Sequence, residues 1–253
     1  MAEITPVTEK RYLLSEKVDA TPEVLIVRFK PEDGGRNVFE PGMFMMIFGV
    51  DGAGKRFTGR AFSIASDPAS PEMEFFVIKQ PVHANQVTTS HFVAANMGDP
   101  FIFKGPSGQF KFNPAAEKKV VFLAGGTGLA PFMSMLRHIK LTNAGTDVIL
   151  LYSVKYPTEV ILKDELVRLA TDLRARLIVT VTRPWQAPSQ SLQQPGMCNE
   201  TGHIDANMIG RHCNDLGERT FYICGPLKFV QALKQTLASL NIPNERVKAD
   251  VWG

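Results

Sequence analysis

The sequence predicts two domains: an antiparallel, six-stranded Greek-key β-barrel over residues 1–113, and an α/β domain with a five-stranded parallel sheet over residues 114–253. In the first half, short apolar runs are separated by turn residues and no long helix is expected, which is typical of a small barrel. In the second half, apolar runs alternate with helical segments, which is typical of a parallel sheet with helices on both faces. The pattern changes near residues 113–117.

The strands of the first domain are expected where apolar residues run between turns built on glycine, proline and aspartate. They are Arg11–Ser15, Val24–Phe29, Met43–Phe48, Ala61–Ala65, Met73–Lys79 and Pro100–Lys104. A short helix over Asn85–Asn96 is expected between the last two strands. Residues 49–56 nearly match a phosphate-binding loop, but Arg56 replaces the required hydroxyl and no helix follows, so we expect a hairpin there.

In the second domain, strands and helices are expected to alternate, with right-handed crossovers between the strands. The strands are expected over residues 120–124, 148–153, 177–181, 220–224 and 247–251. The helices are expected over residues 131–141, 158–173, 205–214 and 226–240. Residues 184–201 are rich in glutamine, serine and proline, so they are expected to form a long loop.

Composition and charge narrow the functional classes. A net charge of +3 gives no basis for nucleic-acid binding, and no apolar run approaches the roughly 20 residues that a membrane span needs. The first residues lack the basic and apolar regions of a secretory signal. The three cysteines are odd in number and widely spaced, which favours a reducing, cytoplasmic location; they are Cys198, Cys213 and Cys224. They are also too few to supply the four thiolates of an iron–sulfur cluster. No metal site is expected, because His203, His212 and Cys213 are too loosely spaced for zinc.

A glycine-rich turn is the first candidate binding motif. The residues Gly125-Gly126-Thr127-Gly128-Leu129-Ala130-Pro131 follow an apolar strand and open a helix. Such a turn directs backbone N–H groups and the positive end of the helix dipole at an anion, and glycines let a pyrophosphate approach closely. Pro131 suits the first helical turn, where its missing N–H costs nothing. The turn is not the usual G-x-G-x-x-G fingerprint, and it also fits an ordinary strand-to-helix connection.

A second motif, Arg60-Ala61-Phe62-Ser63, puts a cation, an aromatic ring and a hydroxyl within four residues. On a strand, Arg60 and Phe62 share a face. A guanidinium can bind a pyrophosphate through two hydrogen bonds, and an aromatic ring can cover a flavin ring. Ser63 can hydrogen-bond a ring nitrogen through its hydroxyl or its backbone. Taken alone, the tetrad is better explained as an ordinary strand with an exposed arginine and a core phenylalanine.

Further motifs accompany these two in a fixed order. They are Val77-Ile78-Lys79 at a strand end, Thr88 and Thr89 within Asn85–Phe92, Gly-Pro-Ser-Gly-Gln-Phe over residues 105–110, and Cys224-Gly225-Pro226 after an apolar strand. The whole series resembles the ferredoxin–NADP⁺ reductase superfamily, over nearly the whole chain. The sequence departs from that family's pattern where Phe62 replaces the usual tyrosine, where Asn85 and Gln86 replace glycines, and at the terminal Trp252-Gly253.

The resemblance implies a FAD-binding barrel and an NAD(P)H-binding α/β domain, with hydride passing from nicotinamide to flavin. It implies catalytic roles for Ser63, Thr127, Cys224, Asp250 and Trp252. It assigns flavin binding to Arg60, Ala61, Phe62, Ser63, Val77, Ile78, Lys79, Thr88 and Thr89. It assigns coenzyme binding to Gly125, Gly126, Thr127, Gly128, Pro131, Lys155, Arg183, Cys224, Gly225, Pro226 and Trp252. Trp252 fits equally an aromatic residue that packs at the end of the sheet.

The choice between NADPH and NADH depends on Lys155 and Arg183, which are expected at neighbouring strand ends. Two cations without an acid there favour NADPH, because an acid usually holds the ribose hydroxyls of NAD. They also fit solvated surface charges, and members of the superfamily that use NADH can carry such an arginine.

The sequence therefore predicts a flavoprotein reductase that passes electrons to a separate acceptor protein, such as a ferredoxin, a flavodoxin or an oxygenase component. The cofactor carries the redox chemistry, and the protein supplies position and electrostatics. Three alternatives stay open at this point. They are an electron-transfer subunit of a larger complex, a reductase of free flavin, and a regulatory nucleotide-binding module without flavin.

Overall fold

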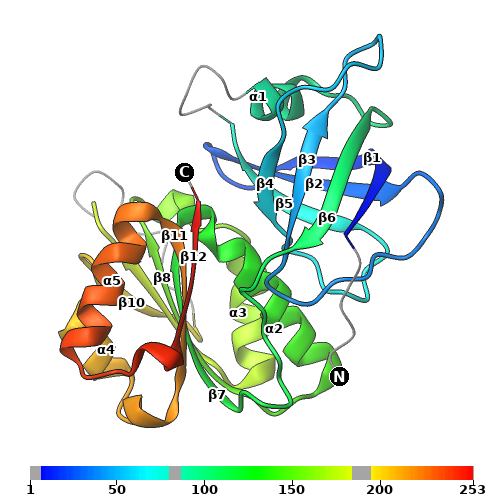
Figure 1. Ribbon diagram of the computed structural model, residues 1–253. Coiled ribbons are helices and arrows are strands. Elements are labelled where there is room, and N and C mark those ends of the chain that lie inside the picture. The colour runs from blue at the N-terminus through cyan, green and yellow to red at the C-terminus, as the bar shows by residue number, and fades with distance from the viewer. Residues whose placement is uncertain (1–6, 80–86, 184–194, 253) are drawn as a thin grey trace. The chain divides into compact units, whose positions relative to one another are not determined.

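The computed structural model describes residues 7–79, 87–183 and 195–252 (Figure 1). Spatial contacts between residues divide the chain into two compact units. The first contains Met1–Phe112 and Met133–His138, and the second contains Asn113–Phe132 and Ile139–Gly253. The domain boundary after residue 113 stays a prediction.

The first unit is built on an antiparallel sheet whose six strands follow the order β4-β3-β6-β1-β2-β5. The strands are β1 (Thr8–Asp19), β2 (Val24–Pro31), β3 (Phe44–Gly49), β4 (Arg60–Ser63), β5 (Met73–Ile78) and β6 (Pro100–Ser107). The sheet nearly closes, because the N–H of Ala65, just after β4, donates to the carbonyl of Glu74 in β5 at 2.8 Å. The last strand, β6, returns between β3 and β1, so the predicted Greek-key barrel is confirmed.

Aromatic side chains fill the barrel. The Phe29 ring meets the rings of Phe75, Phe92, Phe101 and Phe103 edge-on, with centroids 5.0–6.2 Å apart. Phe92 comes from α1 (Val87–Ala94), which lies between β5 and β6 in the sequence, and stacks on Phe101 at 4.9 Å. The helix predicted over residues 85–96 is therefore present, although residues 85 and 86 lie outside the part that the structure describes.

The connection from β3 to β4 is a hairpin, as predicted, and not a phosphate-binding loop. Val50 and Arg56 pair across it in an antiparallel bridge. The Asp51 N–H donates to the Lys55 carbonyl at 2.9 Å, and Gly54 takes a φ of 83°, which favours glycine.

The second unit holds a parallel sheet with the strand order β10-β9-β8-β7-β11-β12. Its strands are β7 (Lys119–Gly125), β8 (Asp147–Val154), β9 (Arg176–Val181), β10 (Cys198–Thr201), β11 (Thr220–Pro226) and β12 (Val247–Trp252). The parallel sheet is confirmed, but it has six strands and not five. The sequence assigned β10 to a loop because its four residues, Cys-Asn-Glu-Thr, form no apolar run; the strand pairs at the sheet edge through its backbone, with Cys198 opposite Ile178.

Helices lie on both sides of this sheet. α4 (Ala206–His212) and α5 (Leu227–Ser239) share one apolar core with β7, β8, β9 and β11, and α3 (Lys163–Leu173) lies on the opposite side (Figure 1). α2 (Ala130–Thr142) begins next to the sheet, where Phe132 stacks on Phe122 with centroids 4.8 Å apart. The prediction that α3 starts at residue 158 was wrong. Pro157–Glu159 instead form a short 3-10 turn, η2, and Leu162 interrupts the helical path with a φ of 50°.

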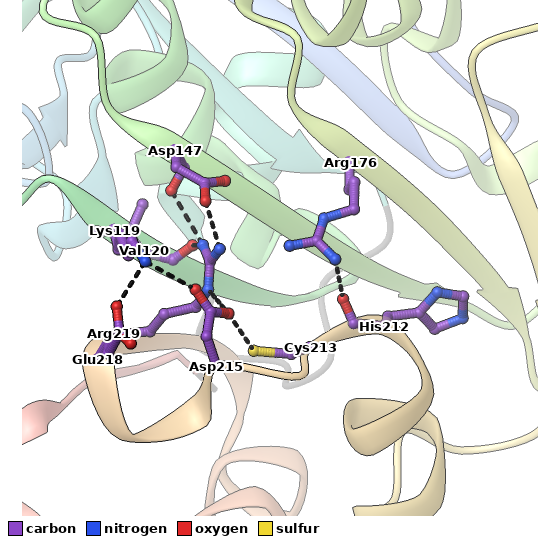
Figure 2. Close-up of polar contacts among 9 residues, drawn as sticks. All are labelled: Lys119, Val120, Asp147, Arg176, His212, Cys213, Asp215, Glu218 and Arg219. Carbon is purple, nitrogen blue, oxygen red and sulfur yellow. Dashed lines mark hydrogen bonds and ion pairs between the residues drawn. The ribbon is translucent and has the colours of Figure 1, made fainter.

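A buried arginine joins the amino ends of the central strands (Figure 2). The Arg219 side chain is 1% exposed, and its Nε donates to the Asp215 carboxylate at 2.6 Å. The same guanidinium is ion-paired with Asp147 and donates to the Val120 carbonyl. These partners compensate the cost of burying the charge, so the cluster ties β7 and β8 to the start of β11. Hydrogen bonding to Arg219 lowers the pKa of Asp215 below the usual carboxyl range.

A second polar cluster holds the segment that precedes β7. The Glu117 carboxylate accepts hydrogen bonds from the Tyr222 hydroxyl at 2.5 Å and from Lys248 Nζ at 2.7 Å. It also accepts the Asn113 N–H at 3.0 Å. Burial, followed by the hydrogen bond to Glu117, raises the pKa of Tyr222, so the hydroxyl stays a donor. Residues 113–117 are thus bound to the sheet of the second unit.

Candidate functional site

The glycine-rich turn lies at the carboxyl end of β7, where open α/β sheets bind their ligands. Gly126–Leu129 form a single 3-10 turn, η1, between the strand and α2. Gly126 has a φ of 55°, a left-handed conformation that favours glycine. Pro131 lies in the first turn of α2, as predicted. The turn can therefore present backbone N–H groups to an anion.

The other glycines of the turn have a packing role that the sequence did not reveal. A Cβ on Gly128 would lie 2.3 Å from the carbonyl oxygen of Cys224. A Cβ on Gly125 would lie 3.1 Å from the Phe229 ring, and one on Gly225 would lie 2.6 Å from it. The first glycine loop (residues 125–131) and the second glycine loop (residues 224–226) are therefore interlocked at the ends of two adjacent strands, β7 and β11.

Cys224 lies between Ala124 of β7 and Asp250 of β12 in the strand register. Its side chain is 1% exposed. Burial, followed by the charge of Asp250, raises the pKa of the Cys224 thiol well above its ordinary value. The raised pKa favours the neutral thiol over the thiolate, which is the nucleophilic form. Thr127, half-buried, lies on the neighbouring loop.

The C-terminal strand carries the remaining residues predicted for the nicotinamide end. Asp250 is half-buried opposite Cys224, and its Oδ1 accepts the N–H of Val251 at 3.1 Å. The backbone of Trp252 pairs with Pro226, which places it at the second glycine loop. The side chain of Trp252 and all of Gly253 lie outside the part that the structure describes.

Lys155 and Arg183 lie together, as the sequence predicts, at the carboxyl ends of β8 and β9. The Arg183 N–H donates to the Lys155 carbonyl at 2.9 Å, and both residues are exposed. The Arg183 guanidinium also donates to the Tyr156 hydroxyl at 3.4 Å. The pair can bind a phosphate that reaches this edge of the sheet.

Glu159 is a residue at this edge that the sequence analysis missed. Its Oε2 accepts the N–H of Lys155 at 2.9 Å and that of Tyr156 at 3.4 Å. An acid therefore does follow β8, although it comes four residues after Lys155 and folds back onto the backbone. The signal was a capping box, in which Glu159 stands three residues after the residue that precedes η2.

In the barrel, Arg60 is the strongest candidate for binding an anion. It lies on β4 opposite Ile47 of β3 and is half-buried. Its guanidinium makes no hydrogen bond or ion pair with any residue that the structure describes. By contrast, Arg56 in the adjacent hairpin is paired with Glu9. Ala61 and Ser63 alternate with Arg60 and Phe62 along β4, so they face the other way.

Other residues predicted for the flavin lie deeper than expected or already have partners. The half-buried Phe62 ring packs against the barrel core and meets Phe92 edge-on at 5.2 Å. Val77 is fully buried in the same core, so it can offer a ligand only its backbone. Lys79 is ion-paired with Asp19 at 2.7 Å. Ile78 is half-buried and Thr89 is buried, while the side chain of Thr88 lies outside the described part.

The sequence is similar to one family of oxidoreductase domains and to several characterised reductases. The family described as "Oxidoreductase NAD-binding domain" matches residues 122–235. The reductase component of propane 2-monooxygenase from Mycolicibacterium goodii is 26% identical over 231 residues, which cover 91% of this chain and 64% of that protein. A flavohemoprotein from Rhodopirellula baltica is 25% identical and matches 96% of this chain. The chain spans 60% of the length of that second relative.

Solved structures share the folds of both units. The FAD/NAD-binding domain of a nitric oxide dioxygenase from Vibrio cholerae has a TM-score of 0.82 at 19% identity, covering 96% of this chain and 98% of that one. A ferredoxin–NADP⁺ reductase from Neisseria gonorrhoeae has a TM-score of 0.74 at 20% identity, covering 98% and 99%. The chain therefore has the two-domain fold of these reductases.

These matches confirm the two-domain fold that the resemblance implied, and membership of the superfamily stays a prediction. At this level of identity the solved structures establish the fold, while the roles of individual site residues stay predictions. Among the described residues, no helix is both long and apolar enough to span a bilayer.

Proposed function

We propose that the chain is a flavin-dependent NAD(P)H oxidoreductase that takes hydride onto FAD and passes electrons to a separate redox protein. The observation that carries this proposal is the pair of interlocked glycine loops at the carboxyl ends of β7 and β11. Together they form a half-site for a dinucleotide on a chain that also carries the antiparallel barrel. The name of the propane monooxygenase relative, a reductase component, supports the same reaction class.

In the nucleotide half-site, residues 126–128 would hold the pyrophosphate through backbone N–H groups at the start of α2. Thr127 and Cys224 would line the nicotinamide end. Because Cys224 stays protonated, it can shape that pocket and donate a weak hydrogen bond without reacting with the coenzyme. Asp250, next to it on β12, would place a negative charge at the same end.

In the barrel, Arg60 fits the flavin pyrophosphate, because a half-buried guanidinium without a described partner can form charge-assisted hydrogen bonds. Ser63, three residues on, would hydrogen-bond the ring through its backbone, because its side chain faces away from Arg60, and Thr89 would contact the pyrophosphate from α1. Phe62 would contact the flavin only through the exposed part of its ring. Bound FAD supplies the redox chemistry, accepting hydride and releasing single electrons.

The preference between NADPH and NADH depends on opposing charges at the ends of β8 and β9. Lys155 and Arg183 favour the 2′-phosphate of NADPH, and the Glu159 carboxylate disfavours it. We therefore propose that both coenzymes reduce the protein, with NADPH favoured by the two cations.

The electron acceptor is proposed to be a ferredoxin, a flavodoxin or an oxygenase component. The support is the functions named for similar proteins, which include a glycine betaine monooxygenase reductase subunit from Chromohalobacter salexigens. A cytoplasmic location is also proposed, because Cys198, Cys213 and Cys224 are free thiols.

The test is anaerobic stopped-flow reduction of purified, FAD-loaded protein by NADPH and NADH side by side. We expect a yellow protein that either coenzyme bleaches. A protein that neither retains nor takes up FAD would contradict the flavin half of the proposal. A protein that binds FAD but is bleached by neither coenzyme would contradict the coenzyme half.

A further inference from the structure

Phe229 lies at the junction of the two glycine loops. It is the third residue of α5, half-buried, and packs on the core shared by β7 and β11. Its Cδ1 would meet a Cβ on Gly125 at 3.1 Å and a Cβ on Gly225 at 2.6 Å. The ring therefore occupies the space where two side chains would otherwise stand, one from each loop.

This packing keeps the loops close. A Cβ on Gly225 would also lie 3.4 Å from the Cα of Gly125, so the two backbones run side by side against the ring. Gly128 closes the contact by resting against the Cys224 carbonyl. A rigid aromatic ring sets such a spacing more firmly than a flexible aliphatic chain, because it has few rotamers and a fixed thickness.

We propose that Phe229 is a positioning residue whose ring sets the spacing of the two glycine loops, and thereby the places of Thr127 and Cys224 at the nicotinamide end of the coenzyme. This inference rests on the proposed function, since it assigns a purpose to the geometry of that half-site. Phe229 itself needs no contact with the coenzyme.

The first test replaces Phe229 by alanine in the FAD-loaded protein. We expect flavin reduction at saturating coenzyme to slow by about 10- to 100-fold, because displacements near 1 Å have effects of this size. Amide hydrogen exchange of residues 125–128 and 224–226 should accelerate. Phe229→Tyr keeps the ring, so its reduction rate and its loop exchange should equal those of the parent protein.

Leu240→Ala is the matched control for this test. Leu240 is partly buried against the same core but follows the far end of α5. Its truncation should lower the unfolding temperature without changing the reduction rate at saturating coenzyme or the exchange of the loops. The proposal is overturned if Phe229→Ala behaves like Leu240→Ala in rate and exchange.

The second test is a thermal-unfolding cycle that needs no coenzyme. Gly225→Ala should lower the melting temperature in the parent protein, because its Cβ meets the ring, and should lower it less in a Phe229→Ala background. Gly210→Ala should change the melting temperature equally in both backgrounds, since a Cβ on Gly210 in α4 meets no atom within 4 Å. Equal losses for Gly225→Ala in both backgrounds would overturn the packing role.

The two hypotheses fail in different ways. If the parent protein is reduced by neither coenzyme, the proposed function fails, while exchange and the unfolding cycle still report on the ring. If the parent protein is reduced and Phe229→Ala is reduced equally fast, only the positioning role fails.

Discussion

Gly128→Ala tests whether the contact between the glycine loops matters for hydride transfer. The new Cβ would lie 2.3 Å from the Cys224 carbonyl oxygen, whereas ordinary contact begins at 3.4 Å. One loop must therefore move by about 1.1 Å, because the obstacle is backbone and cannot rotate away. A displacement of this size lowers a well-positioned reaction rate by about 100-fold, or about 2.7 kcal/mol in the barrier.

The assay is anaerobic stopped-flow reduction of the FAD-loaded variant at saturating NADPH and NADH, followed by flavin absorbance. Gly210→Ala is the matched control, since Gly210 lies within α4 with open space around its Cα. That change should leave the rate unaltered and stabilise the fold by about 0.5–1 kcal/mol. The reasoning is refuted if folded Gly128→Ala protein is reduced at the rate of the parent protein.

Three further predictions concern charges. Arg60→Ala should raise the FAD dissociation constant by about 10- to 100-fold, since charge-assisted hydrogen bonds contribute about 1.5–3 kcal/mol, whereas Arg56→Ala should leave it unchanged. Fluorescence titration of the apoprotein with FAD measures both variants. A dissociation constant for Arg60→Ala equal to that of the parent protein would remove Arg60 from the site. Glu159→Gln should shift the ratio of kcat/KM values about fivefold towards NADPH, because a nearby negative charge is lost; an unchanged ratio would contradict this role. Because Arg219 lowers the pKa of Asp215, the stability that the pair contributes is complete above the ordinary carboxyl value of 3.8 and is lost as the pH falls below it. Calorimetry should show a lower melting temperature for Asp215→Asn than for the parent protein at pH 7. The melting temperature of the variant should also fall less on acidification, and a fall as steep as that of the parent protein would contradict the contribution of this pair.

Most of the fold was predictable because its signals are local. Apolar runs bounded by glycine and proline located eleven of the twelve strands in the part of the chain that the structure describes. The exception, β10, is polar and pairs through backbone groups that carry no sequence signature. The start of α3 was misplaced for a related reason. A single left-handed residue, Leu162, ends the helical path, and a leucine gives no warning of that conformation.

The site was less predictable than the fold because side-chain direction depends on neighbouring elements. Alternation along β4 put Arg60 and Phe62 on one face and allowed Phe62 to be either a core residue or a cover for the flavin, and the structure packs its ring on the core against Phe92. The glycines of the first loop were expected to make room for phosphate. That role stays a prediction, and the structure adds that Gly125 and Gly128 make room for Phe229 and Cys224, which are about a hundred residues away in the chain.

The hydrogen bonds of Glu117 decide where the second half of the protein can be cut out for study. A fragment starting at Lys118 would lose the carboxylate that accepts both the Tyr222 hydroxyl and Lys248 Nζ, and a deeply buried phenol would have to find another acceptor. A fragment starting at Asn113 keeps that carboxylate together with the N–H that orients it. Residues 113–117, which connect the two units, thus belong to the smallest fragment of the second unit that should be expressed alone.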